Sequence, residues 1–400
     1  MREPFARTVA IPHYDEVVRR AIFDACRWST QRGDGPTLAP FALVLPRQTW
    51  RWLATTAEAL ACEATSAEQE LLSRPDLHRE LGLPIALQRV LADVSKLPTA
   101  GPVRFMRFDF HPTVEGLRIT EGNLDVCGGF IESAGVAPMV AEQIDGVTSP
   151  ADPALALAEA IRGAAGEHAR VGLMHLSIFT EDRQVVSYLA RRMAAVGLEP
   201  SPFHVGALGL VGDLLVAGPS RVPLDFVFRF FPSEWLPRLS RRSGWPRLLT
   251  AGATPVANPG WAVLSQSKRF PLVFGELSTA LPTWRALLPE TRTPTSSVLG
   301  DDWVLKPALG HEGYLVSVAG VGSRRRRERL CARAVARPDR WVMQRRFVSC
   351  AIDTPFGPRH VCVGVFIVNG RAAGAYARAA TRPLIDDGAQ DVIVLVEEGA

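Results

Sequence analysis

The chain has 400 residues and a formal net charge of +4 at pH 7, with 47% hydrophobic and 22% charged residues. This length can bury a large core in two or three lobes, and the composition is that of an ordinary globular protein. The small positive charge permits anionic ligands. It does not by itself indicate nucleic-acid binding, which would need concentrated basic patches.

The cysteines and the apolar segments indicate in which compartment the protein would be found. The six cysteines are scattered, with no CxxC pair and no zinc-like spacing, which is typical of reduced thiols in a cytosol. The N-terminus has no apolar signal-peptide segment, and no apolar run reaches membrane-spanning length. We therefore expect a cytoplasmic protein that contacts neither a membrane nor nucleic acid; the oligomeric state stays open.

Residues 1–100 form the first expected region, which is helical. Apolar residues recur at spacings of three and four over residues 14–28, 49–72 and 84–94, and this pattern predicts three helices. Pro84 would open the third helix, because proline suits the first turn. The short apolar run at 36–46 is interpreted as a connector between helices.

Residues 101–150 contain a predicted hairpin. Two strand-like runs, 105–110 and 116–123, flank a turn with Pro112 and Gly116. Antiparallel pairing would set position 109 opposite 121, and 107 opposite 123. Side chains alternate along a strand. The polar face would therefore carry Arg107, Asp109, Glu121 and Asn123, and the core face would carry Met106, Phe108 and Phe110.

The polar face of this hairpin has two possible interpretations. Two carboxylates opposite each other repel, so Asp109 and Glu121 need a compensating partner. A hard cation such as Mg²⁺ takes carboxylate and amide oxygens, and an arginine beside it can neutralise a phosphoryl group. The alternative is a surface hairpin with its charges in water, since strands with one polar face are common. The spacing alone leaves both interpretations open.

Residues 151–255 alternate between helical and strand-like segments, which predicts an α/β lobe. Helices are expected at 151–169, with Asp152 as N-cap, and at 180–197, with Thr180 as N-cap. A buried strand is expected at 171–179, and further strands are expected at 203–211, 213–217 and 224–230. Asp225 and Arg229 on the last strand are interpreted as a structural ion pair rather than as pocket residues.

Residues 256–400 bring further charged side chains. A helix is expected over 261–277, carrying Lys268. A strand then ends at Lys306, a loop with Gly310 and Gly313 follows, and residues 314–318 form another strand. Backbone N–H groups of such a loop can surround phosphates, and a nearby lysine can meet their charge. The loop lacks the GK[ST] ending of a Walker A motif.

The last hundred residues continue with strands. Residues 341–347 predict a short strand that could form the hinge over a nucleotide base. Residues 360–380 predict a hairpin that turns at Asn369–Gly370, a strong turn dipeptide, and whose second strand ends near Arg378. The arginine run after Ser323 predicts a helix with a solvated basic face.

Six motifs, taken in chain order, resemble those of glutathionylspermidine synthase-type ligases, a branch of the ATP-grasp superfamily. They are Arg107-Phe-Asp109-Phe, Glu121-Gly-Asn123, Lys268 in WAVLSQSK, the loop from Lys306-Pro through Gly310 to Gly313, Gln344, and Arg378 in GAYARAA. The likeness extends from the N-terminal helices to the last residues. It implies an α+β ATP-grasp fold with an N-terminal helical region (1–100), a metal-binding hairpin segment of the ATP-grasp core (101–150), an α/β pre-ATP-grasp-like lobe (151–255) and a nucleotide-binding region (256–400).

The resemblance also implies a role for each motif residue. The ligands of Mg²⁺, with two ions on the ATP phosphates, would be Asp109, Glu121 and Asn123. The lysines that contact the nucleotide would be Lys268 and Lys306. The loop over the γ-phosphate would be Gly310, His311, Glu312 and Gly313, and the adenine would be lined by Gln344, Arg345 and Arg346. Arg107 and Arg378 would stabilise the phosphoryl and acyl-phosphate intermediates.

The activity implied by the resemblance is that of an ADP-forming carboxylate–amine ligase, which uses ATP and Mg²⁺ to join a small-molecule acid to a small-molecule amine. Two departures bear on the substrates. His311 stands where the family carries an arginine, and residues 121–127 read EGNLDVC instead of EYNADTP. We therefore expect an amino-acid or peptide acid other than glutathione, an amine other than spermidine, and a role in biosynthesis. Cys127 is interpreted as a small apolar filler.

Two alternative functions remain. A catalytically inactive nucleotide-binding protein would keep the fold without turnover, and a phosphotransferase would stop at the phosphorylated product. Retention of the whole set of charged motif residues argues against loss of catalysis. ADP release that depends on an amine separates a ligase from a phosphotransferase.

Overall fold

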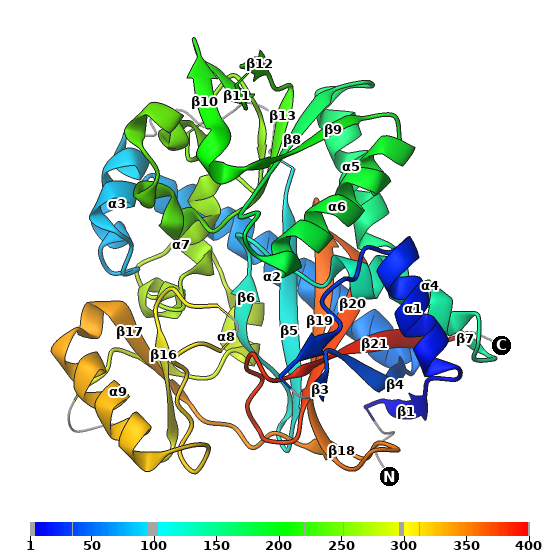
Figure 1. Ribbon diagram of the computed structural model, residues 1–400. Helices are drawn as coiled ribbons and strands as arrows, with labels where there is room; N and C mark the ends of the chain where they lie inside the picture. The colour runs from blue at the N-terminus through cyan, green and yellow to red at the C-terminus, as the bar shows by residue number, and fades with distance from the viewer. Residues whose placement is uncertain are drawn as a thin grey trace.

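A nine-stranded sheet lies at the centre of the protein in the computed structural model, which describes residues 5–33, 35–93, 103–219, 221–250, 252–295, 300–311 and 313–398 (Figure 1). The main path of the sheet is β1-β4-β21-β20-β19-β5-β6, with β7 paired to β21 and β18 paired to β19. The strands are β1 Arg7–Ala10, β4 Leu38–Leu45, β5 Phe105–Thr113, β6 Gly116–Asn123, β7 Val147–Thr148, β18 Ala351–Ile352, β19 Arg359–Val368, β20 Arg371–Ala380 and β21 Gln390–Glu397.

The two hairpins predicted from the sequence are present in this sheet. β19 turns into β20 at Asn369 and Gly370, whose φ angles of 46° and 79° are both left-handed. Two-residue turns of this kind match the twist of antiparallel strands, and asparagine followed by glycine adopts them readily. β5 pairs antiparallel with β6, and β5 also pairs with β19. The polar hairpin is therefore the outer edge of the sheet.

Hydrophobic clusters cover both faces of the sheet. Along β21, Val392 and Val394 belong to one cluster, whereas Ile393 and Leu395 belong to the other. This division follows from the alternation of side chains along a strand. The second face is covered by α1 Tyr14–Asp24, the π-helical turn Ile131–Val136, α4 Ala137–Ala141 and α5 Pro153–Ala165.

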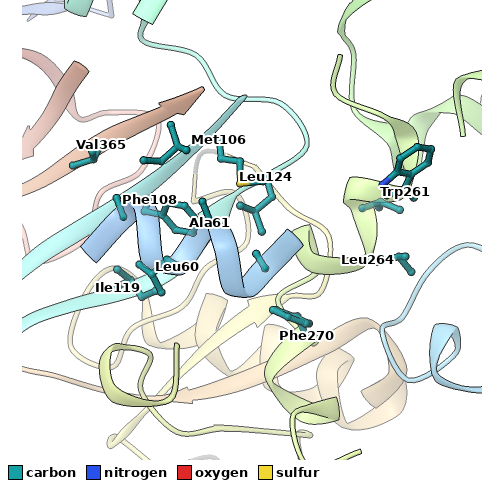
Figure 2. Close-up of a cluster of buried hydrophobic side chains, with 14 of the residues drawn as sticks. Leu60, Ala61, Met106, Phe108, Ile119, Leu124, Trp261, Leu264, Phe270 and Val365 are labelled. Carbon is teal, nitrogen blue, oxygen red and sulfur yellow. The ribbon is translucent and has the colours of Figure 1, made fainter. Parts of the chain in front are cut away.

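The first face is covered by the long helix α2 (Arg47–Leu72). Figure 2 shows Leu60 and Ala61 of this helix next to Phe108 and Ile119 of the edge hairpin. Phe108 and Phe110 are fully buried, as expected for the core face of the hairpin. The segment around α7 Val263–Gln266 and α8 Pro282–Leu287 closes this cluster, with Trp284 packed edge-on against Phe108.

A second lobe contains a parallel sheet of four strands in the order β14-β13-β8-β9. Its strands are β8 Arg170–His175, β9 Glu199–His204, β13 Phe226–Phe230 and β14 Val256–Ala257. Helix α6 (Thr180–Ala195) packs on β8 and β9, and α5 packs on α6 (Figure 1). Asp152 caps α5 as predicted, because its carboxylate accepts from the Leu155 N–H. A small antiparallel sheet extends this lobe through β10 Leu208–Val211, β11 Leu214–Ala217 and β12 Val222–Pro223.

A third group of elements contains the lysine and glutamine of the predicted nucleotide site. Three antiparallel strands in the order β15-β17-β16 pack against α9, to the lower left in Figure 1. Their bounds are β15 Thr291–Arg292, β16 Trp303–Pro307, β17 Trp341–Arg345 and α9 Arg324–Ala336. The remaining described elements include α3 Ile85–Ala92, β2 Gln31–Arg32 and β3 Gly35–Pro36.

Three local predictions are wrong. The connector expected at 36–46 is strand β4, which pairs with β1 and, in parallel, with β21. The helix expected over 261–277 ends at Gln266, because Pro271 lacks an N–H and the Lys268 N–H instead donates to the carbonyl of Ala308. The strand expected at 314–318 is reduced to one bridge between Ser317 and Leu305, since the left-handed Leu315 interrupts it.

Two further findings concern the helices and the cysteines. None of the helices that the structure describes is long and apolar enough to cross a membrane. All six cysteines are free.

We predict that Phe108→Ala destabilises the protein by about 3–5 kcal/mol, because the ring is fully buried between α2 and Trp284 and its loss leaves a cavity. Chemical denaturation measures the change in unfolding free energy. Phe23→Ala is the matched control, since that ring is 71% exposed. Equal losses in the two variants would contradict the packing described for this face.

Candidate active site

A cleft of about 1380 Å³ opens along the polar face of the edge hairpin. Strands β5 and β6 form one wall, the end of β16 and the glycine loop after it form another, and β19 and β20 form the floor. All the site residues predicted from the sequence that the structure describes line this cleft; Glu312 lies outside the described residues. The structure therefore brings together side chains from five segments that are far apart in the sequence.

The hairpin carries its polar side chains into the cleft with one irregularity. Arg107 pairs with Asn123 in the predicted register. Phe108 pairs with Gly122 and Phe110 with Ile119, so two residues of β6 lie opposite Asp109 alone. This arrangement is a β-bulge, which bends the strand and re-aims side chains beside it. Asp109 therefore lies opposite both Thr120 and Glu121, rather than opposite Glu121 alone as predicted.

The Asp109 carboxylate is held on both sides. Arg107 donates from Nε and Nη2 to its two oxygens at 2.7 and 2.9 Å, and Asn123 Nδ2 donates to Oδ2 at 2.9 Å. Gly364 of β19 lies directly behind this pair, and a Cβ there would come within 2.7 Å of both side chains. The glycine thus provides the space in which Arg107 and Asp109 meet.

Arg107 is fixed further by the floor of the cleft. Its Nη1 donates to the carbonyl of Gly128 at 2.7 Å, and its guanidinium lies 4.9 Å from the ring centre of Tyr376 on β20. The Tyr376 hydroxyl donates to Asp391 at 2.9 Å. Burial, and then Asp391, raise the pKa of Tyr376, so the phenol stays protonated and remains a donor. Sequence analysis missed Tyr376, although it lies on the same strand face as Arg378.

Glu121 meets a cation from another segment. Lys268 Nζ lies 2.9 Å from Glu121 Oε2 and donates to the carbonyl of Gly310 at 2.6 Å. Burial raises the pKa of Glu121, but Lys268 and Lys306 outweigh it and lower the pKa below its usual value. Lys268 therefore joins the hairpin to the start of the glycine loop.

Lys306 is buried at the end of β16. Its Nζ donates to Gln344 Oε1 at 2.8 Å and lies 3.3 Å from the carbonyl of Thr120. Burial lowers the pKa of Lys306 to about 8; Glu121 opposes this shift and Lys268 adds to it. A second anion, such as a nucleotide phosphate, would relieve the penalty of holding this charge out of water.

His111 is a half-buried cleft residue that sequence analysis missed. It lies on β5 two residues beyond Asp109, and its ring centre is 5.5 Å from that of Phe347, after the hinge strand. Burial lowers its pKa to about 4, with Asp109 opposing and Lys306 adding to the shift. The ring is therefore neutral near pH 7. The strand was predicted to end at residue 110, which left His111 in the turn, whereas β5 extends to Thr113; no local pattern indicated that Phe347 would lie against the ring.

The remaining predicted residues of the cleft are three arginines. Arg378 on β20 donates from Nη2 to the carbonyl of Asp386 at 2.7 Å. Arg345 lies over the ring of Trp303 at 5.5 Å, and Arg346 Nη1 donates to the carbonyl of Ala319 at 3.1 Å. These contacts fix the three arginines on the protein itself, so only part of each guanidinium is available to a ligand.

His311 of the glycine loop has a partner from the parallel-sheet lobe. Its Nε2 lies 2.5 Å from Glu234 Oε1, in the 3₁₀ helix η4 (Ser233–Arg238). Trp235 presents its ring edge-on to the imidazole at 5.7 Å between ring centres. Glu234 is 77 positions away in the sequence, and no local pattern marked it.

The segment after Asn123 is held by a buried ion pair. Asp125 accepts from the Arg229 guanidinium and from both the N–H and the hydroxyl of Ser233. Arg229 was expected to pair with Asp225, which instead accepts from the Arg170 N–H. Cys127, farther along, lines the cleft, and burial raises the pKa of its thiol to about 12, which suits the predicted filler.

The predicted Mg²⁺ ligands are Asp109, Glu121 and Asn123, and their contacts show what kind of ion they could hold. In the described part of the chain, no three His, Cys, Asp or Glu side chains gather as metal ligands would. The set Asp109, Glu121 and Asn123 offers two carboxylates and one amide on one wall of the cleft, which fits Mg²⁺ when phosphates and water supply the other positions. Each carboxylate already forms an ion pair, Asp109 with Arg107 and Glu121 with Lys268. These residues therefore suit a Mg²⁺ ion that binds together with phosphates better than a free Mg²⁺ ion.

Comparison with known proteins supports the fold. A putative acid–amine ligase of Haemophilus influenzae is 28% identical over 222 residues, which are 53% of this chain and 54% of that protein, so the match spans about half the length of the relative. The solved structure of a glutathione synthetase-like effector from Globodera pallida, in apo form, superposes with a TM-score of 0.63 at 13% identity and covers 96% of this chain and 99% of the other. The predicted α+β fold of ATP-grasp type is confirmed. Residues 42–397 match the family model described as glutathionylspermidine synthase pre-ATP-grasp, and the chain belongs to this family.

Proposed function

We propose that the protein is an ATP-dependent carboxylate–amine ligase that releases ADP and forms an amide bond through an acyl phosphate. One observation carries this proposal: Asp109 and Glu121 of the hairpin meet Lys268 and Lys306 of two distant segments in one cleft, beside Arg107. Oxygen ligands, lysines and an arginine around one volume are what phosphoryl transfer to a carboxylate needs. The likeness to a putative acid–amine ligase supports the same reaction.

The bound Mg²⁺, held by Asp109, Glu121 and Asn123, would neutralise phosphate charge. Lys268 and Lys306 would orient the phosphates from the opposite wall, and Gln344 would fix the Lys306 ammonium through its 2.8 Å hydrogen bond. Residues 344–346 would border the adenine, and loop 310–313 would cover the γ-phosphate. The protein thereby contributes positioning and charge neutralisation.

The reaction would proceed in two steps that balance. A carboxylate oxygen attacks the γ-phosphorus and ADP leaves, which gives an acyl phosphate. The amine nitrogen then attacks the acyl carbon, the C–O bond to phosphate breaks, and the nitrogen loses a proton. Arg107 and Arg378 would stabilise the negative charge in both steps, and closure of the cleft would exclude water from the acyl phosphate.

The substrates would be small molecules. We propose an amino-acid or peptide acid other than glutathione and an amine other than spermidine, because residues 121–127 and His311 depart from the family pattern. The cleft also carries Glu181 and Asp391 beyond the hairpin, and each lies near an arginine, Arg32 or Arg27, so these carboxylates do not by themselves select the charge of the amine.

A transfer experiment tests the reaction. Candidate acids labelled with ¹⁸O in the carboxylate are incubated with the protein, MgATP and a panel of amines. The proposal predicts amine-dependent ADP release and one ¹⁸O atom in the phosphate, because the C–O bond breaks. ADP release without any amine requirement, and with a stable phosphorylated product, would indicate a phosphotransferase. Absence of turnover across the panels, together with tight MgADP binding, would favour a nucleotide-binding protein without catalysis.

We predict that Asp109→Asn abolishes turnover while the fold stays intact. The substitution keeps the shape of the side chain but removes the charge that Arg107 and a phosphate-bound cation share. Steady-state ADP release measures the effect, and circular dichroism checks the fold. Asp213→Asn is the matched control, since Asp213 forms an exposed ion pair with Arg247. A wild-type rate of ADP release in Asp109→Asn would show that the Asp109 carboxylate does not take part in the reaction.

We predict that Lys306→Met weakens MgADP binding about tenfold or more and does not lower the melting temperature of the ligand-free protein. A hydrogen bond to a charged group is worth about 1.5–3 kcal/mol, hence the loss of affinity. The pKa of Lys306 is depressed by burial, so its charged form opposes folding at pH 7, and the neutral methionine relieves that penalty. Calorimetric titration and thermal melting measure the two effects. Unchanged MgADP affinity would place Lys306 outside the nucleotide site.

A further inference from the structure

His311 and Glu234 make a polar contact between the glycine loop and the parallel-sheet lobe. The two side chains lie 2.5 Å apart, and the Glu234 side chain is only 7% exposed. Its second oxygen, Oε2, is buried without a hydrogen-bond partner among the described residues. A carboxylate in this position is costly to bury unless a cation accompanies it. His311 is the group that meets it.

Glu234 is held from behind by the hairpin itself. The preceding residue, Ser233, donates its N–H and its hydroxyl to Asp125, and Asp125 is paired with Arg229. Asp125 lies two residues after Asn123, at the end of β6. The position of Glu234 is therefore fixed relative to the proposed phosphate site, through side chains that are all buried.

The charges around the imidazole favour its protonated form. Burial lowers the pKa of His311, but the hydrogen bond and the charge of Glu234 outweigh it and raise the pKa above its usual value. Lys268 opposes the shift, and the buried Asp125 adds to it. For Glu234, burial raises the pKa, and His311 outweighs it and holds the carboxyl ionised.

We propose that Glu234 is a positioning residue that keeps His311 as an imidazolium cation at the glycine loop and ties that loop to the parallel-sheet lobe, so that the nucleotide phosphates meet a cation that depends on pH. This inference rests on the proposed nucleotide site. Lys268 donates to the carbonyl of Gly310, next to His311, so the two cations border the same loop. A protonated imidazole there attracts phosphate oxygens, and a neutral one does not.

The sign of the pH dependence follows from the raised pKa. His311 is charged below its pKa in the folded protein, so its contribution to phosphate binding is present at low pH and is lost as the pH rises through that value. Removal of the Glu234 charge moves this loss to lower pH, because burial alone lowers the pKa of a histidine. An arginine at position 311 stays charged throughout.

The test is calorimetric titration of the full chain with the non-hydrolysable analogue AMP-PNP and Mg²⁺ between pH 6 and 9. Wild type, Glu234→Gln and His311→Arg are compared, with Glu142→Gln as the matched control because Glu142 forms an exposed ion pair with Arg20. Because arginine stays charged between pH 6 and 9, any pH dependence of the affinity of His311→Arg comes from other groups, such as the ligand and Lys306. We expect Glu234→Gln to bind about tenfold more weakly near neutral pH and to lose affinity at lower pH than wild type.

The proposal would be overturned if Glu234→Gln bound AMP-PNP with the same affinity as wild type at every pH. The same pH dependence in His311→Arg and wild type would also overturn it. The imidazole titration of His311, followed by NMR and assigned through its loss in His311→Arg, gives a readout that needs no ligand. The proposal predicts a lower pKa for His311 in Glu234→Gln, and an unchanged pKa contradicts it. Failure of all four proteins to bind nucleotide at any pH would instead contradict the proposed function, and the NMR titration would still decide whether Glu234 holds the imidazolium.

Discussion

The neutralisation of two carboxylates on one strand pair is the constraint on which the rest of the cleft depends. Asp109 and Glu121 lie on neighbouring strands, and each is matched by a cation: Asp109 by Arg107 of its own strand, and Glu121 by Lys268 of a distant segment. The first pair needs the open space over Gly364, and the second needs the chain to leave its helix before Lys268. Both features place a charge on the cleft, where a nucleotide phosphate or its cation could replace an existing contact.

Buried polar contacts fix the parallel-sheet lobe against this hairpin. Asn258, after β14, exchanges hydrogen bonds with the backbone of Phe105 and also donates to the carbonyls of Leu124 and Asp125. Arg229 reaches Asp125 from β13. Removal of one partner from such a buried pair costs about 3–5 kcal/mol. The geometry of the cleft is thereby coupled to the folding of the lobe, and side chains such as Glu234 come within reach of the glycine loop.

The features of this arrangement that depend on neighbouring residues in the sequence could be predicted. The alternation of residues 105–123 gave the polar face of the hairpin, and Asn369–Gly370 marked the turn between β19 and β20. β4 was missed because it is buried in parallel pairing with β21, some 350 positions away, and a short apolar run carries no period that distinguishes a strand from a connector. Glu234 and Phe347 were missed because only tertiary packing brings them to His311 and His111.

The central claim is that the hairpin binds a nucleotide together with Mg²⁺. Thermal melting of the wild-type protein with Mg²⁺ alone, ADP alone, and both together tests it most directly. We expect the melting temperature to rise most with both ligands and not to rise with Mg²⁺ alone, since Arg107 and Lys268 already neutralise the two carboxylates. At a hundred times its Kd, the complex should add about 2.7 kcal/mol to the free energy of unfolding. A rise with Mg²⁺ alone, or no rise in any condition, would show that the hairpin does not bind Mg²⁺ together with a nucleotide.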